Sequence, residues 1–162
     1  MNFAIFVHNK TLEDNNGGSI VLAHHKHALE ALGHIATLIN LTDDIPEGTE
    51  AIIYQSEWYN HIEDKLRAFQ GLKMCWLGHM YPDSRYAMPP IGLIQYADVF
   101  FTQWQGDCVR EAEKQLGKPI SYLPHGYCET CNTEGREVGG LPNAVFIGAG
   151  YPERSQDWLD YS

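Results

Sequence analysis

The chain has 162 residues, enough for one well-packed domain, and its apolar share of 44% is that of an ordinary globular protein. No apolar run approaches the ~20 residues that a membrane-spanning helix needs, so we expect no membrane span. A net charge of −10 with scattered basic residues argues against a nucleic-acid partner, because such proteins hold phosphates through clustered Lys and Arg. The first seven residues lack the features of a secretory signal, which favours a cytoplasmic protein.

The first half of the chain alternates short apolar runs with amphipathic stretches. An apolar run at Met1–Val7 predicts a strand, and a polar stretch leads from it through Gly17 and Gly18 into a helix. Ser19 is the expected N-cap of that helix, and Gly33 its C-terminal stop. The next elements predicted by the same patterns are strands at Ile35–Leu41 and Ala51–Tyr54, a helix at Glu57–Phe69 and a fourth strand at Lys73–Leu77.

The second half continues the alternation up to Pro124. The patterns predict a short helix at Ile91–Tyr96, a strand at Asp98–Thr102, a helix at Asp107–Leu116 and a strand at Ile120–Leu123. Strands that alternate with helices and read as continuous apolar runs are typical of a parallel sheet buried on both faces. We therefore expect a Rossmann-like, doubly wound α/β fold of about six strands, with helices on both faces.

The last part of the chain breaks this pattern. Residues 1–127 are expected to form the Rossmann-like domain, and the Gly-, Glu- and Asn-rich stretch 128–142 a linker or loop. Residues 143–162 resume with a strand-like run, Asn143–Gly148, and a helical stretch. They read as the start of a second domain or as a C-terminal strand and helix.

Two polar loops are expected to face each other at the ligand edge of the sheet. In doubly wound folds, ligands bind beyond the carboxyl ends of the strands, where the winding reverses. In the common strand order that point lies between strands one and four, which would bring together the loops His8–Ser19 and Gly78–Pro90. In the first loop, Gly17 and Gly18 open a helix whose free N–H groups suit an anion. A tight turn without a ligand explains the same glycines.

The second loop and the sixth strand add further polar side chains. His79 follows directly on a strand end, where a general base or substrate-orienting residue is placed, although a capping histidine bonded to backbone fits the same position. Tyr81 and Asp83 follow it. His125 and Gly126 form a hinge and cleft wall, or a plain chain reversal. A histidine cluster on the first predicted helix (His24, His25 and His27) reads as a solvated face rather than a metal site.

The cysteines leave two interpretations open. Cys75 lies within an apolar strand pattern and is expected in the core. Cys128 and Cys131 have the C-x-x-C spacing of zinc or redox sites, but His125 is the one further ligand in view. A pair of free thiols in a loop is the other interpretation, and we expect no metal site.

Three segments in order resemble the GT-B glycosyltransferases, in the branch that contains family 4-like and spore-maturation-type enzymes. The glycine-rich loop and the helix end LEALGHIATL are similar to the opening of that family. The run Ala97-Asp98-Val99, followed later by Lys118-Pro119-Ile120 and LPHGY, is similar to its domain crossing, with His125 where the family usually has Asn. Phe146-Ile147-Gly148 and the later Arg154 resemble the opening of the donor-binding domain.

The resemblance implies the N-terminal, acceptor-side half of a nucleotide-sugar-dependent glycosyltransferase. His79 would be the catalytic base or orienter, and the nucleotide sugar would be a donor substrate, with no further cofactor. The implied binding residues are His8, Gly17, Gly18, Ser19, Tyr81, Asp83, His125, Gly126 and Arg154. The family's late donor-gripping carboxylates have no counterpart here. A C-terminal domain or a second copy of the chain would have to supply the other half, and the chain alone would be inactive.

Two other functions remain open at this point. The chain could be a stand-alone, non-catalytic module that binds a nucleotide or sugar and dimerises to build a two-sided cleft. It could also be a flavodoxin-like or other nucleotide-binding α/β protein, which a flavin spectrum would reveal. The fold alone does not choose among them, because this architecture serves many unrelated chemistries.

Overall fold

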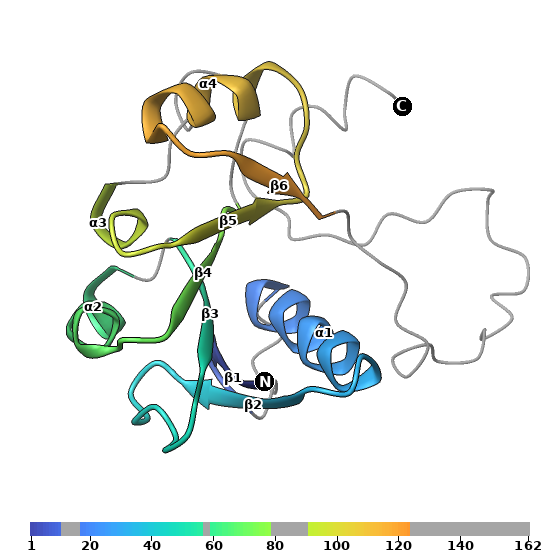
Figure 1. Ribbon diagram of the computed structural model, residues 1–162, viewed down its shortest axis with the longest axis vertical. Coiled ribbons are helices and arrows are strands. Elements are labelled where there is room, and N and C mark those ends of the chain that lie inside the picture. The colour runs from blue at the N-terminus through green and yellow to red at the C-terminus, as the bar shows by residue number, and fades with distance from the viewer. Residues whose placement is uncertain (11–16, 57–58, 79–90, 124–162) are drawn as a thin grey trace, which may run out of the picture. The chain divides into compact units, whose positions relative to one another are not determined.

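The computed structural model describes residues 1–10, 17–56, 59–78 and 91–123, all within the unit Met1–Asn132 of the chain (Figure 1). The predicted linker at 128–142 and the segment 143–162 lie outside these residues. None of the helices in the described ranges is long and apolar enough to span a membrane. The elements in chain order are β1 (Asn2–Val7), α1 (Gly17–Ala31), β2 (Ile35–Asn40), β3 (Ala51–Gln55), α2 (Tyr59–Ala68), β4 (Leu72–Trp76), α3 (Ile91–Ile94), β5 (Val99–Thr102), α4 (Asp107–Leu116) and β6 (Ile120–Tyr122).

The six strands form one sheet in the order β2-β1-β3-β4-β5-β6, and every neighbouring pair is parallel. This confirms the predicted Rossmann-like α/β fold. In the register of the sheet, Phe3 of β1 lies beside Ala36 of β2 on one side and Ala51 of β3 on the other. The chain therefore runs from β1 outward to β2, returns past β1 to β3, and then adds each later strand on the same side.

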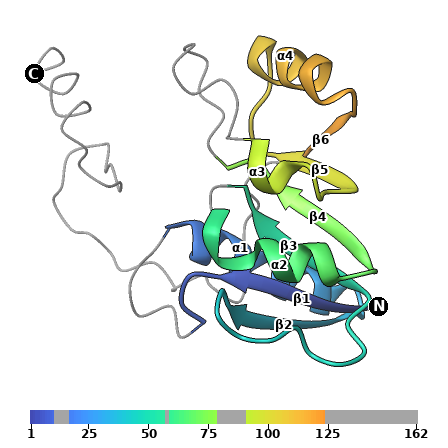
Figure 2. The ribbon, with the colours of Figure 1, turned by 90° about the vertical axis from the view of Figure 1, so that its left-hand side faces the viewer.

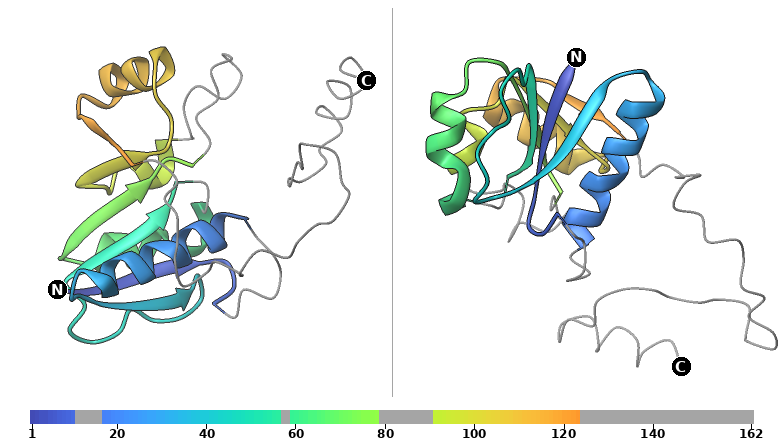
Figure 3. Two further views of the ribbon diagram at one scale, coloured as in Figure 1. Left: turned by 90° about the vertical axis from the view of Figure 1, so that its right-hand side faces the viewer. Right: turned by 90° about the horizontal axis from the view of Figure 1, so that it is seen from below.

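The helices of the described residues cover both faces of the sheet, one on the first face and three on the second. On the first face, α1 packs through the buried Leu22. On the second, α2, α3 and α4 pack through Ile62, Leu93 and Ala112. Figure 2 looks onto the face that carries α2 and α3, and Figure 3 (left) onto the face that carries α1. The division follows from right-handed crossovers, since the connection from β1 to β2 runs in the opposite direction to all later ones.

Strict alternation along β1 shows why this strand lies in the middle of the core. Phe3, Ile5 and Val7 face the α1 side, and Ala4 and Phe6 face the other, all with at most 7% of their surface exposed. A strand that buries both of its faces must be apolar at consecutive positions, because side chains alternate between the faces. The continuous apolar run at the start of the sequence is therefore a direct consequence of its central place.

The end of α1 confirms the role expected of Gly33. This glycine has φ of +82°, and its N–H donates to the Glu30 carbonyl at 3.0 Å. The N–H of His34 donates to the Leu29 carbonyl, also at 3.0 Å. These two bonds make a Schellman motif, which needs a residue that tolerates the left-handed conformation. The chain can thus leave α1 and enter β2 within four residues.

A buried tyrosine fastens the short helix α3 to the sheet. Tyr54 is fully buried in β3, and its hydroxyl donates to the carbonyl oxygen of Leu93 at 2.9 Å. Burial raises the pKa of this phenol, with a further contribution from Cys75 beside it. Cys75 is itself fully buried in β4, which confirms its predicted place in the core.

Candidate functional site

The winding of the sheet reverses between β1 and β3, and not between strands one and four as the sequence analysis expected. The cause is the connection from β2 to β3, residues 41–50, which carries the chain back past β1 instead of outward beyond β2. In this order the carboxyl ends of β1 and β3 lie next to each other. The loop after β4, which holds His79, begins one strand farther along the sheet.

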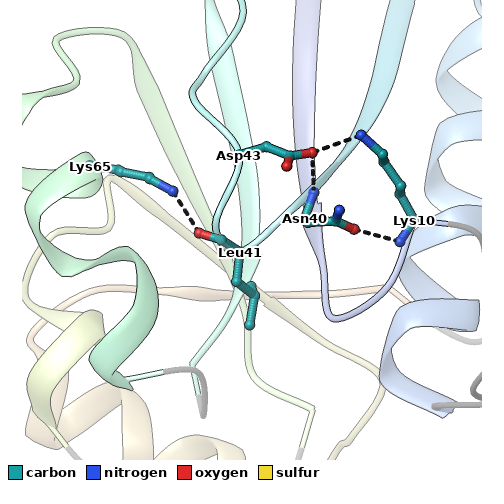
Figure 4. Close-up of polar contacts among 5 residues, drawn as sticks. All are labelled: Lys10, Asn40, Leu41, Asp43 and Lys65. Atoms are coloured by element: carbon teal, nitrogen blue, oxygen red, sulfur yellow. Dashed lines mark hydrogen bonds and ion pairs between the residues drawn. The ribbon is translucent and has the colours of Figure 1, made fainter.

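The residues just after β1 are fastened to the end of β2 (Figure 4). The backbone N–H of Lys10 donates to Asn40 Oδ1 at 2.8 Å, and Lys10 Nζ donates to Asp43 Oδ2 at 2.9 Å. The backbone N–H of Asn40 donates to the same carboxylate at 3.1 Å. The hydrogen bond from Lys10, followed by that from the Asn40 backbone, lowers the pKa of the Asp43 carboxyl below its ordinary value. The ammonium group of Lys10 is therefore paired with the carboxylate of Asp43.

Ser19 is not the N-cap of α1. The helix begins at Gly17, so Ser19 lies inside its first turn and is fully buried. Its hydroxyl oxygen accepts a hydrogen bond from the backbone N–H of His8 at 2.9 Å. Gly17 and Gly18 adopt the helical conformation themselves, so the helix starts three residues earlier than the capping rule indicated. The buried Ser19 hydroxyl thus joins the start of α1 to the end of β1.

A hydrogen-bond network fixes the chain where it leaves β4. The carbonyl oxygen of Gly78 accepts from Gln103 Nε2 at 2.8 Å and from Trp104 Nε1 at 2.9 Å. Gln103 Oε1 in turn accepts from Trp76 Nε1 at 2.8 Å. Because Gly78 immediately precedes His79 in the sequence, these bonds hold the backbone just before the expected catalytic histidine.

Two buried polar side chains that sequence reasoning missed lie at the end of β3: Gln55, its last residue, and Ser56, directly after it. Gln55 is 4% exposed and Ser56 is fully buried. The Ser56 hydroxyl has no hydrogen-bond partner. None of the described residues forms a hydrogen bond with the Gln55 carboxamide. The one signal in the sequence is a Gln-Ser pair directly after the apolar run Ala51–Tyr54.

All buried residues with polar, non-aromatic side chains in the described ranges lie at this one edge of the sheet. They are Ser19, Gln55, Ser56 and Thr102. Thr102, at the end of β5, donates from Oγ1 to the Leu77 carbonyl at 2.7 Å. Buried polar groups normally have partners, so the Ser56 hydroxyl and the Gln55 carboxamide are exceptions to that rule at the end of β3.

The histidines of α1 do not form the solvated face that the sequence analysis expected. The ring of His25 packs edge-on against Phe101 and Trp76, with centroids 5.5 Å and 6.4 Å away. His24 and His27 are half-buried. The helix lies close enough to β4 and β5 for one of its polar positions to pack against their aromatic rings. Within the described residues, no group of three or more His, Cys, Asp or Glu side chains could hold a metal ion.

Most of the remaining expected site residues lie outside the described ranges. These are His79, Tyr81, Asp83, His125, Gly126 and Arg154, together with Cys128 and Cys131. Of the expected binding residues, His8, Gly17, Gly18 and Ser19 are described, and they meet where β1 ends and α1 begins. The chain matches no protein-family model, no curated protein and no solved structure.

Proposed function

We propose that this chain is the acceptor-side domain of a cytoplasmic, nucleotide-sugar-dependent glycosyltransferase, with its ligand at the carboxyl edge of the sheet. The observation that carries the proposal is the one-sided distribution of buried polar groups: the Ser56 hydroxyl has no partner, and the Gln55 carboxamide bonds to none of the described residues. Burying a polar group without a partner costs free energy, and such groups persist where function needs them. The segments that resemble GT-B enzymes supply the reaction type.

In the proposed reaction, a hydroxyl of the acceptor attacks the anomeric carbon of the donor sugar. A new carbon–oxygen bond forms, the bond to the nucleoside diphosphate breaks, and the hydroxyl proton passes to a base. His79 is the proposed base or orienter, since it directly follows the backbone that Gln103 and Trp104 hold. Gly17 and Gly18, at the N-terminus of the 15-residue helix α1, would approach the donor diphosphate or the acceptor.

Isothermal titration calorimetry of the natural gene product with UDP-glucose, UDP-N-acetylglucosamine, GDP-mannose and ADP-glucose tests the proposal. We expect one donor to bind with a Kd between about 1 μM and 1 mM, the range usual for enzyme substrates. His79→Ala should leave that affinity within about threefold and abolish sugar transfer, because a base acts in the transition state and adds little to ground-state binding. If none of the donors binds, the proposal is wrong.

A second function is favoured by one specific observation, the reversal between β1 and β3. Doubly wound proteins with this strand order hold a nucleotide at the reversal within a single sheet, without a second domain. A stand-alone binding module would bind a nucleotide or sugar stoichiometrically and release it unchanged. Product analysis after long incubation separates the two functions, because the module leaves the nucleotide sugar intact. Light scattering shows whether the module dimerises. A flavin absorption spectrum of the purified protein would contradict both proposals and indicate a flavin-binding protein instead.

A further inference from the structure

Two glutamines at the carboxyl edge differ in how their side chains are used. Gln103, after β5, is bonded at both ends of its carboxamide, to Trp76 and to the Gly78 carbonyl. Gln55, at the end of β3, is 96% buried yet bonds to none of the described residues. The Ser56 hydroxyl next to it is likewise without a partner. Gln103 thus holds the fold together, whereas Gln55 keeps a donor and an acceptor that the fold does not use.

The Gln55 carboxamide lies at the rim of the sheet between β3 and β4. Ile53 belongs to the apolar cluster under α1, and alternation places Gln55, two residues later, on the same face. Its Nε2 atom is 3.2 Å from the point where a β-carbon on Gly78 would stand. A larger residue at this position would be in tight contact with the amide and with the Trp76 ring. The side chain therefore reaches the end of β4, where ligands of doubly wound folds bind.

Among the described residues, the lysines near this edge do not favour a phosphate group as the partner of Gln55. Lys10, just after β1, and Lys65, in α2, both reach groups near the end of β2, and Figure 4 shows both already bonded within the chain. Lys10 pairs with Asp43, and Lys65 donates to the Leu41 carbonyl at 2.6 Å. An uncharged ligand group with several hydroxyls needs no cation. It matches a carboxamide, whose carbonyl accepts from one hydroxyl while its NH2 donates to the next.

We propose that Gln55 binds adjacent hydroxyls of a sugar ring. This inference rests on the proposed function and assigns its sugar-reading side chain. The Gln55 carbonyl accepts a hydrogen bond from one ring hydroxyl and its NH2 donates to the neighbouring one. A sugar bound in this way gives the Gln55 carboxamide the hydrogen bonds that the fold leaves unmade.

The side-chain amide of Gln55 is a direct reporter in ¹⁵N-edited NMR, where the signal missing from Gln55→Leu identifies it. The probes are the methyl glycosides of glucose, galactose, mannose and N-acetylglucosamine at millimolar concentration, with inorganic pyrophosphate as the comparison. We expect the Gln55 signal to shift with at least one glycoside and to stay in place with pyrophosphate. A Gln55 signal that no glycoside moves overturns the inference, whatever else moves. The proposed function is then judged separately by the donor titrations.

The variant also separates a binding role from a structural one. Gln55→Leu removes an unsatisfied amide and keeps the volume, so we expect Tm to rise by about 2–4 °C. Affinity for the responding glycoside should fall at least tenfold. Gln115→Leu, at an exposed glutamine of α4, is the matched control and should change neither quantity appreciably. A fall in Tm for Gln55→Leu, together with unchanged affinity, would show that Gln55 is structural and overturn the inference.

Discussion

The amino-terminal edge of the sheet uses carboxylates to fasten strands, whereas the carboxyl edge keeps polar groups buried and partly unused. At the amino-terminal edge, the backbone N–H of Asn2 donates to Glu50 at 2.8 Å, and that of Lys73 donates to Asp98 at 2.9 Å. At the carboxyl edge, Ser56 keeps a buried hydroxyl with no partner. The hydrogen bonds at the amino-terminal edge stabilise the fold, whereas the unpartnered hydroxyl at the carboxyl edge lowers its stability. Substitutions of bonded groups should therefore lower stability at either edge, whereas substitution of the unpartnered group at the carboxyl edge should not.

The largest effect is expected at the amino-terminal edge, for Gly71→Ala. A β-carbon at this position would collide with the carbonyl oxygen of Glu50, which accepts the backbone N–H of Leu72 at 3.0 Å. Because the obstacle is backbone, the start of β4 must shift away from β3, at a cost of about 2–3 kcal/mol in the free energy of unfolding. Urea denaturation measures this loss. Gln70→Ala, at the exposed neighbour, is the control, and equal stability of the two variants would contradict the close approach.

The next effect tests a polar group of the carboxyl edge that does have partners. Thr102→Val keeps the shape of the side chain but removes the hydroxyl that donates to the Leu77 carbonyl and accepts the Trp104 N–H. Leaving that buried carbonyl without its donor should cost about 1–3 kcal/mol in the free energy of unfolding. Thr37→Val, at an exposed position of β2, is a matched control for the change of residue type. A stable Thr102→Val protein would show that the bond contributes nothing.

A smaller effect of opposite sign is expected at the orphaned hydroxyl. Ser56→Ala removes a buried polar group that has no partner, so stability should be unchanged or rise by up to about 1 kcal/mol. Thermal unfolding without ligand measures the change. If Ser56→Ala unfolds as readily as Thr102→Val, the two hydroxyls serve the same purpose, and the contrast between bonded and orphaned groups at this edge is wrong.

The smallest effect concerns the paired charge at the end of β2. Lys10 lowers the pKa of Asp43, so the contribution of their bond is present above the ordinary carboxyl pKa of about 3.9 and is lost as the pH falls through the lowered value. Lys10→Met should return the pKa of Asp43 toward its ordinary value, which carboxyl ¹³C NMR titration follows. Because the pair is exposed to solvent, added salt should weaken the effect. An unchanged titration in Lys10→Met would mean that the lysine is not the cause.

The elements were predictable from sequence because the apolar pattern depends on local periodicity. The helix Asp107–Leu116 was predicted with its observed bounds, and the strand predicted at Ala51–Tyr54 ends one residue later, at Gln55. The order of the strands was not predictable in this way. The order depends on whether the chain passes back beside β1 or continues outward beyond β2 after residue 41. The composition of residues 41–50 does not predict which of the two occurs.

Site residues were harder to predict, because their roles depend on neighbours that are distant in sequence. Ser19 fits the capping rule, but its partner is the N–H of His8 on the preceding strand. The sequence around His25 predicts a surface histidine, but in the fold its ring packs against Phe101, which lies 76 positions later in the chain. Gln55 and Ser56 carry no motif at all. Their interest comes from burial without partners, which only the folded arrangement reveals.

The position of β1 between β2 and β3 has a consequence for how the protein is made. As the chain leaves the ribosome, β1, α1 and β2 can assemble first, since they are consecutive and β1 pairs with β2 along its whole length. β3 then joins the open side of β1, and β4, β5 and β6 each join the strand synthesised just before them. No strand has to be inserted between two that are already paired. The sheet can therefore grow in the order of synthesis, and the edge that still accepts strands is always the one nearest to the newest part of the chain.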